Sequence, residues 1–99
     1  MVDGTRPARY SAGMATIYRY ALLFDDTATA TVDDLPADAQ VIRFGVQMGF
    51  PSIWAIVDPT KPPAPQTFKA VNSGDPFPDD ATYIGTIQAD AAVTHLVRL

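Results

Sequence analysis

Short runs in which apolar and polar residues alternate make up most of the chain from residue 14 onward, and turn residues separate these runs at regular intervals. Alternation with a period of two places one side chain in the core and the next in solvent, as in a half-buried strand. The clearest run is residues 41–48, where Ile42, Phe44, Val46 and Met48 share one face. The next run, SIWAIV at 52–57, is almost continuously apolar, which predicts a central strand buried on both faces.

The same pattern predicts seven strands, at residues 16–22, 27–32, 41–48, 52–57, 66–71, 83–88 and 92–98. A tight connection is expected at 49–51 and a hairpin about 89–91, and longer loops are expected at 33–39, at the proline-rich 59–65 and at 72–80. No segment sustains an apolar period of 3.6, so at most one helical turn is expected, near 78–81. The chain is therefore predicted to be all-β, a single small sandwich or barrel of about seven short, mostly antiparallel strands.

The first thirteen residues differ in composition from the rest and are predicted to form an extended N-terminal arm outside the domain at 14–99. They contain two Gly, one Pro and two Arg but almost no aliphatic side chains. Two explanations stay open. Met14 is a natural initiator, which would make the arm a product of an upstream start codon, or the arm is a real extension that docks on a partner.

Composition and charge exclude several classes of protein. The chain has 99 residues, 47% of them hydrophobic and 18% charged, which fits one small globular domain and not a disordered tail. A net charge of −4 makes nucleic acid an unlikely partner. There is no Cys, which excludes a disulfide scaffold, a thiol nucleophile and a Cys-based metal centre. No apolar run is long enough to cross a bilayer and the N-terminus has no signal-peptide core, so no membrane association is expected.

All eleven acidic residues are Asp, and ten of them fall in predicted turns. A short carboxylate accepts hydrogen bonds from nearby backbone amides and so stabilises turns. The three Asp-Asp pairs could instead supply oxygen ligands for Ca²⁺, but none has the spacing of a calcium loop and no Glu is present. We therefore expect no metal site and no cofactor.

The single histidine, His95, lies between Val93 and Val97 on one face of the last predicted strand, a pattern typical of a core or interface residue. A catalytic role would require a nucleophile beside it, and no spacing singles out one of the serines or threonines. The glycines are scattered singly and form no phosphate-binding motif. The sequence thus predicts no catalytic residues and no enzymatic activity.

Loop aromatics and arginines are the remaining candidates for contacts. Phe50 and Phe77 fall in predicted loops beside prolines, where an aromatic side chain either covers one end of a barrel or anchors an interface. Arg6, Arg9 and Tyr10 would contribute contacts from the arm. Arg19, Arg43 and Arg98 are the candidate contacts for an anion, should the protein bind one.

Several blocks of the sequence resemble a family of small uncharacterised bacteriophage and prophage proteins, a domain of unknown function. These blocks are MATIYRY, SIWAIVDP, FKAVNSGDPFPDDATYIGTIQ and the closing VTHLVRL, and together they span residues 14–99. The resemblance implies a phage origin and a β-rich fold, and it lends no catalytic residues.

Two functions are compatible with these observations. The first is a virion-associated accessory protein, such as a capsid decoration or minor structural protein, which would form homo-oligomers or bind other structural subunits. The alternative is a protein of the host cytoplasm that binds a host protein or a small signalling molecule, for instance to counter host defence.

Overall fold

A computed structural model of the chain describes residues 14–89 and 91–99. These residues form seven strands and no helix: β1 (Thr16–Ala21), β2 (Thr29–Val32), β3 (Gln40–Gln47), β4 (Phe50–Val57), β5 (Gln66–Asn72), β6 (Thr82–Ala89) and β7 (Ala92–Arg98). All pairs are antiparallel, which confirms the predicted all-β class. The predicted arm at 1–13 lies outside the described residues.

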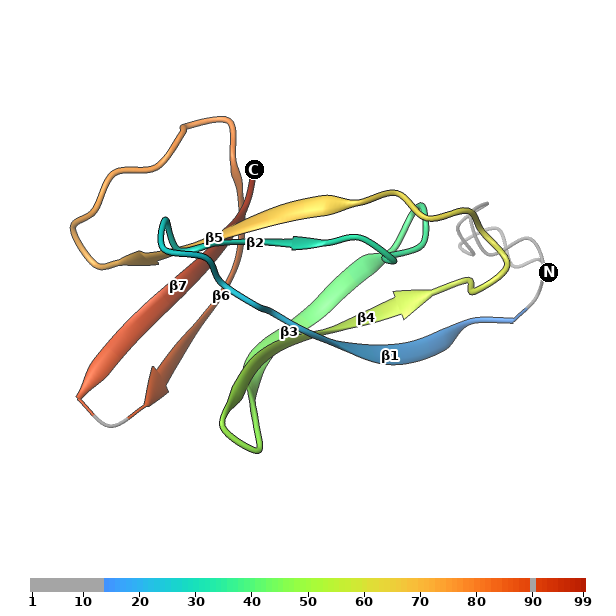
Figure 1. Cartoon of the computed structure of the whole chain (residues 1–99), viewed down its shortest axis with the longest axis horizontal. Coiled ribbons are helices and arrows are strands. Elements are labelled where there is room, and N and C mark those ends of the chain that lie inside the picture. The colour runs from blue at the N-terminus through green and yellow to red at the C-terminus, as the bar shows by residue number, and fades with distance from the viewer. Residues whose placement is uncertain (1–13, 90) are drawn as a thin grey trace, which may run out of the picture.

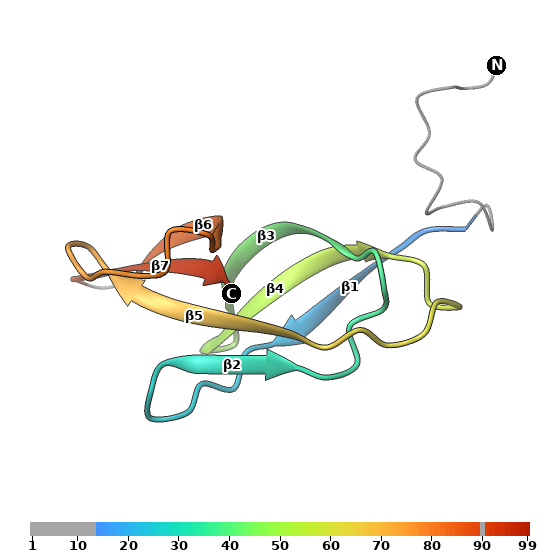
Figure 2. The same cartoon turned by 90° about the horizontal axis from the view of Figure 1, so that it is seen from above.

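The strands form two sheets, with the order β1-β4-β3 in one and β2-β5-β7-β6 in the other (Figures 1 and 2). Side chains from both sheets bury one hydrophobic core, in which Ile53, Ala55 and Val57 of β4 meet Phe68 of β5 and Leu96 of β7. The sheets approach most closely where β3 and β6 run side by side (Figure 2). A Cβ at Gly85 of β6 would lie only 3.3 Å from the Cβ of Phe44, so this approach depends on glycine.

The central position predicted for residues 52–57 is correct, because β4 pairs with β1 on one side and with β3 on the other. Ile53, Ala55 and Val57 point into the core, whereas Ser52, Trp54 and Ile56 lie on the outer face. Residues flanking a central strand cover its outer face, which explains why no side chain from Ser52 to Val57 is fully exposed.

The face predicted for residues 41–48 is wrong because the register shifts between Val41 and Arg43. This bulge adds Ile42 to the strand, so that Val41 and Phe44 both pack on the core while the Ile42 side chain is exposed. Met48 leaves the strand altogether and lies in the turn that joins β3 to β4. A bulge changes which residues share a face of the strand but leaves the apolar pattern of the sequence unchanged, so the pattern alone does not reveal it.

Two predicted boundaries also need correction. Phe50 lies in β4 and not in a loop, since the β3–β4 turn contains only two residues. The second strand begins at Thr29 and not at residue 27, because Ala28 has a φ of 60°, outside the range of extended backbone. Residues 78–81 form a single turn, closed by the Ala81 N–H donating to the Pro78 carbonyl at 3.0 Å.

The described aspartates lie in turns and loops, as predicted: Asp25, Asp26, Asp33, Asp34, Asp38, Asp58, Asp75, Asp79 and Asp80 are all outside strands, while Asp90 lies outside the described residues. Two of these carboxylates show how an aspartate stabilises its own turn. The Asp25 carboxylate accepts hydrogen bonds from Thr27 and Thr29, and the Asp58 carboxylate accepts them from the backbone and hydroxyl of Thr60 at 3.0 and 2.6 Å. These bonds to the charged form, led by the one from the threonine hydroxyl, hold the pKa of each carboxyl below its usual value.

Candidate functional site

The β3–β4 hairpin ends in an apolar tip formed by Val46, Met48 and Phe50, whose side chains are 45%, 90% and 57% exposed. Gln47 and Phe50 form the last pair of the two strands, and Met48 and Gly49 have φ values of 51° and 84°. Positive φ at both central residues is the geometry of a type I′ turn, which matches the twist of the strands and favours Asn or Gly. Met48 is neither, so an exposed apolar side chain occupies a strained position.

The outer face of the β1-β4-β3 sheet carries an arginine on each side of the only tryptophan of the chain. Arg19 of β1 and Arg43 of β3 both pair with Trp54 of β4. The Arg43 guanidinium lies over the indole, 5.3 Å from the ring centroid, at a distance typical of a cation–π contact. Gly45 makes room for this layer, because a Cβ there would lie 3.1 Å from Nε of Arg43 and 3.4 Å from the indole.

Arg19 lies over β4 from the opposite side. Its Nη1 donates to Oγ of Ser52 at 2.9 Å, and the Ser52 hydroxyl donates to the Phe50 carbonyl at 3.1 Å. Ser52 is fully buried under this contact, although it points to the outer face. Two of the three predicted anion contacts are therefore brought together over the central strand.

His95 is the centre of a chain of hydroxyl hydrogen bonds on the outer face of the second sheet. Its Nε2 lies 2.8 Å from Oγ of Ser73, its Nδ1 lies 2.8 Å from Oγ1 of Thr86, and Thr86 in turn lies 2.6 Å from the hydroxyl of Tyr83. Thr86 is the cross-strand neighbour of His95. Ser73 follows β5, in a turn in which the Asp75 N–H donates to the Asn72 carbonyl and Gly74 has a φ of 94°.

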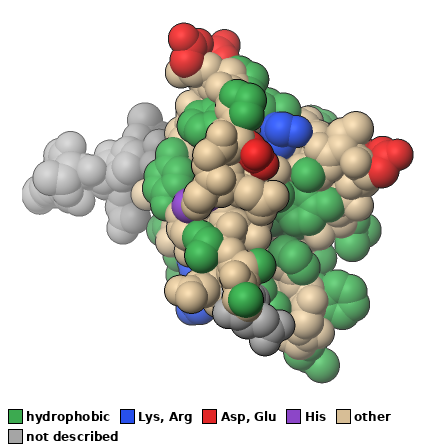
Figure 3. All heavy atoms as spheres, turned by 90° about the vertical axis from the view of Figure 1, so that its left-hand side faces the viewer, with side chains coloured by type: hydrophobic (Ala, Val, Ile, Leu, Met, Phe, Trp, Pro, Cys, Tyr) green, Lys and Arg blue, Asp and Glu red, His purple; other side chains and the backbone are tan. Residues whose placement is uncertain are grey.

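A pocket of about 380 Å³ lies beside this chain, with buried Val71 and Val97 among its lining residues. Phe77 lines the same pocket and remains 44% exposed, so the structure places it against an outer sheet face and not at the end of a barrel. Figure 3 shows this side of the molecule, with the histidine at the surface next to hydrophobic side chains. Chemically, the cluster has a hydroxyl nucleophile and a base, but a neutral hydroxyl and not a carboxylate orients the ring.

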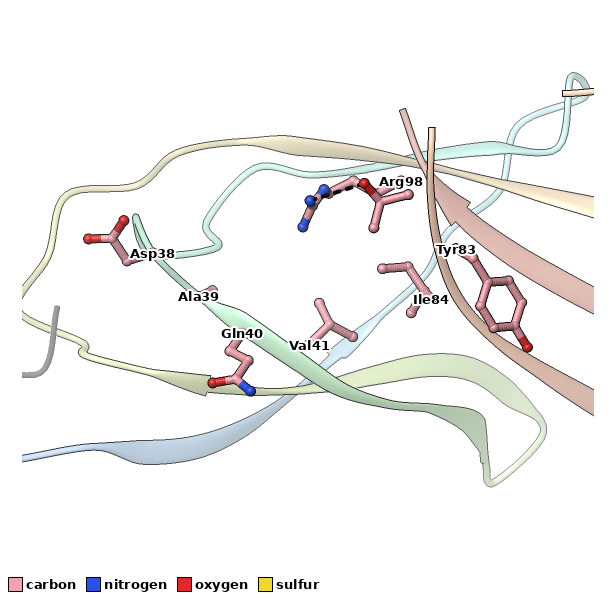
Figure 4. Close-up of a pocket in the computed structure, with 8 residues that line it drawn as sticks. Asp38, Ala39, Gln40, Val41, Tyr83, Ile84 and Arg98 are labelled. Carbon is pink, nitrogen blue, oxygen red and sulfur yellow. Dashed lines mark hydrogen bonds between the residues drawn. The ribbon is translucent and has the colours of Figure 1, made fainter. Parts of the chain in front are cut away.

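Arg98 lies in a separate cleft of about 340 Å³ between β3 and β6 (Figure 4). Val41 of β3 and Ile84 of β6 line the cleft, and Nη2 of Arg98 donates to Oγ1 of Thr82 at 3.4 Å. The cleft also includes Asp38, whose carboxylate pairs with Lys61 at 3.5 Å. Arg98 therefore belongs to the second sheet and does not join Arg19 and Arg43.

The sequence-based candidates thus separate into distinct places. Phe50 lies at the hairpin tip and Phe77 at the His95 pocket, while Arg6, Arg9 and Tyr10 lie outside the described residues. Sequence reasoning missed Met48, Trp54 and Ser73. A methionine directly before a glycine in a two-residue turn was a signal for Met48, whereas nothing local connects Ser73 to His95 or Trp54 to the two arginines.

Comparison with known proteins identifies a family for the chain. No curated protein and no solved structure matches the chain. Among the described residues no helix is long and apolar enough to cross a membrane. A family model for a domain of unknown function, DUF7352, covers residues 14–99, the whole of the predicted domain. The chain therefore belongs to the DUF7352 family, a domain of unknown function.

Proposed function

We propose that this domain acts by protein–protein contact as an accessory component of a bacteriophage particle, either a capsid decoration protein or a minor structural protein. The observation that carries the proposal is the apolar tip of the β3–β4 hairpin, where Val46, Met48 and Phe50 are exposed together. The blocks of sequence that resemble phage and prophage proteins support the phage setting.

The tip has the chemistry of an interface anchor. Apolar side chains in contact with solvent gain free energy when a partner covers them, at roughly 25 cal/mol per Å². Met and aromatic residues are enriched in interface cores, and a methionine adapts its shape to an irregular partner surface. A residue that favours the turn geometry, such as Asn, would make the free protein more stable than Met48 does. The presence of Met at this position is explained if a partner covers it.

The hydrogen bonding of His95 is compatible with a contact function. Both ring nitrogens of His95 are hydrogen-bonded to hydroxyls, which hold the ring in place on its sheet. We further propose that the partner is a second copy of the chain or another structural subunit of the particle, since symmetric self-association is common among soluble proteins.

Mass spectrometry of purified particles tests the proposal directly. The protein should be present in particles, and the variant M48N combined with F50T should be lost from them. V93T is the matched control, because Val93 is also an exposed apolar side chain but lies on β7 of the other sheet. Absence of the wild-type protein from particles, or equal incorporation of both variants, would overturn the proposal.

An alternative function is a protein of the host cytoplasm that binds a host protein or a small signalling molecule. The observation that favours a small anionic molecule is the arrangement of Arg19 and Arg43 over the central strand. Detection of the protein in infected cells but not in particles would favour this alternative.

A further inference from the structure

The outer face of the β1-β4-β3 sheet presents three successive rows of side chains. The middle row is Arg19, Trp54 and Arg43, one residue from each strand. The row on one side contains Ile17, Ile56 and Gln40, and the row on the other contains Ala21, Ser52 and Gly45. The apolar pair Ile17 and Ile56 therefore lies directly next to two guanidinium groups and an indole.

The two guanidiniums come from opposite edge strands but both lie over β4. Arg19 contacts Ser52 and Arg43 contacts Trp54. Ser52 and Trp54 are two residues apart on one strand, so these contact points are separated by roughly 7 Å. A phosphate or diphosphate group is wide enough to accept hydrogen bonds from two guanidiniums that far apart. Both side chains are fixed by their contacts, which lowers the entropic cost of binding.

No described carboxylate forms an ion pair with the arginines of this face. The only ion pair between described residues joins Lys61 to Asp38, so neither arginine has a carboxylate within ion-pair distance. Asp33 and Asp34 line a depression that Arg19 also borders, without an ion pair to it. A guanidinium that lies over an indole can still direct N–H donors to an oxyanion.

Ile17 extends this site with an apolar surface, since its side chain is 57% exposed next to the partly buried Ile56. A ligand that matches both parts has an anionic group and a flat apolar group a few ångströms apart. Nucleoside phosphates have this form: the phosphate would contact the guanidiniums, and the base would lie on the isoleucines and the indole edge.

We infer that the outer face of the β1-β4-β3 sheet binds a nucleoside phosphate, with the phosphate held by Arg19 and Arg43 and the base against Ile17 and Ile56. This inference deepens the alternative function and is independent of the hairpin tip. The phosphate belongs to a free nucleotide and not to a nucleic acid strand, because the net charge of −4 opposes contact with a long polyanion.

Trp54 is the only tryptophan, so its fluorescence reports on this face alone. We expect AMP to change the emission of the full chain in a saturable way, with adenosine and inorganic phosphate each binding at least about tenfold more weakly than AMP. The variants R19Q and R43Q should each weaken AMP binding about tenfold, because each removes charge-assisted hydrogen bonds to the phosphate. R98Q is the matched control, since it removes the same charge from the other sheet, and it should bind like the wild type.

Four results would overturn the inference. The first is the absence of a saturable response to AMP at millimolar concentration by fluorescence and by calorimetry. The second is unchanged AMP binding in the R19Q/R43Q double variant with its fold intact by circular dichroism. The third is binding of inorganic phosphate as tight as that of AMP, which would leave an anion site without a nucleoside. Tighter binding of a short oligo-dT than of AMP, with a steep salt dependence, would assign the face to single-stranded nucleic acid and also overturn the inference. None of these results affects incorporation into particles, so the inference and the proposed contact function can fail separately.

Discussion

Replacing Met48 with Asn should stabilise the isolated protein. Met48 has a φ of 51° at the first central position of the β3–β4 turn, and its side chain is 90% exposed. Left-handed backbone costs a residue with an ordinary side chain roughly 1–2 kcal/mol, whereas Asn adopts it readily. Because the side chain is almost fully exposed, its removal forfeits little packing within the free protein. We therefore expect M48N to raise the free energy of unfolding by about 1 kcal/mol.

Urea denaturation, followed by the fluorescence of Trp54, measures this change. For a domain of this size a gain of 1 kcal/mol corresponds to a rise in Tm of about 4–8 °C. M48A is the matched control, because it removes the same exposed side chain but keeps an ordinary residue at positive φ, and it should match the wild type. If M48N is no more stable than M48A, backbone strain at this turn does not lower the stability of the wild-type protein. The argument that Met48 is retained for a partner then loses its physical basis.

Three further predictions follow from the core, the turns and the histidine. Phe68 is fully buried between the sheets, so F68A should lower the free energy of unfolding by about 3–5 kcal/mol in urea denaturation, and F68L by much less. The pKa of Asp58 is lowered in the folded state by its bonds to Thr60, so the stability it contributes is present above the unfolded pKa of about 3.9 and is lost as pH falls through the folded value. D58N should therefore be less stable than the wild type at pH 7 and lose less stability on acidification in thermal melts; parallel pH profiles would contradict this assignment. H95F should keep the fold but lower stability by about 1 kcal/mol in thermal melts, because the hydroxyls of Ser73 and Thr86 each lose a partner.

Local features of the sequence were sufficient to predict the elements of this fold. Alternating apolar residues marked the strands, and aspartates such as Asp25 and Asp58 marked where strands end, because a short carboxylate satisfies the amides of its own turn. Residues 52–57 were identified as the central strand because both faces had to be apolar or covered. Each of these predictions depends on residues within a few positions of one another.

Tertiary structure decided which of these elements meet. The bulge at Ile42 reverses the face of part of β3, and it exists because the strand must follow β4 and still place Phe44 against the second sheet. Strand pairing likewise brings Arg19 and Arg43 to Trp54 and brings Ser73 to His95, across 22 positions of sequence in the second case. The sequence by itself determined strands, turns and class, because those follow from short-range preferences. The pairing of the strands and the composition of the candidate sites came only from the tertiary structure, because strand order is chosen by burying apolar surface from the whole chain at once.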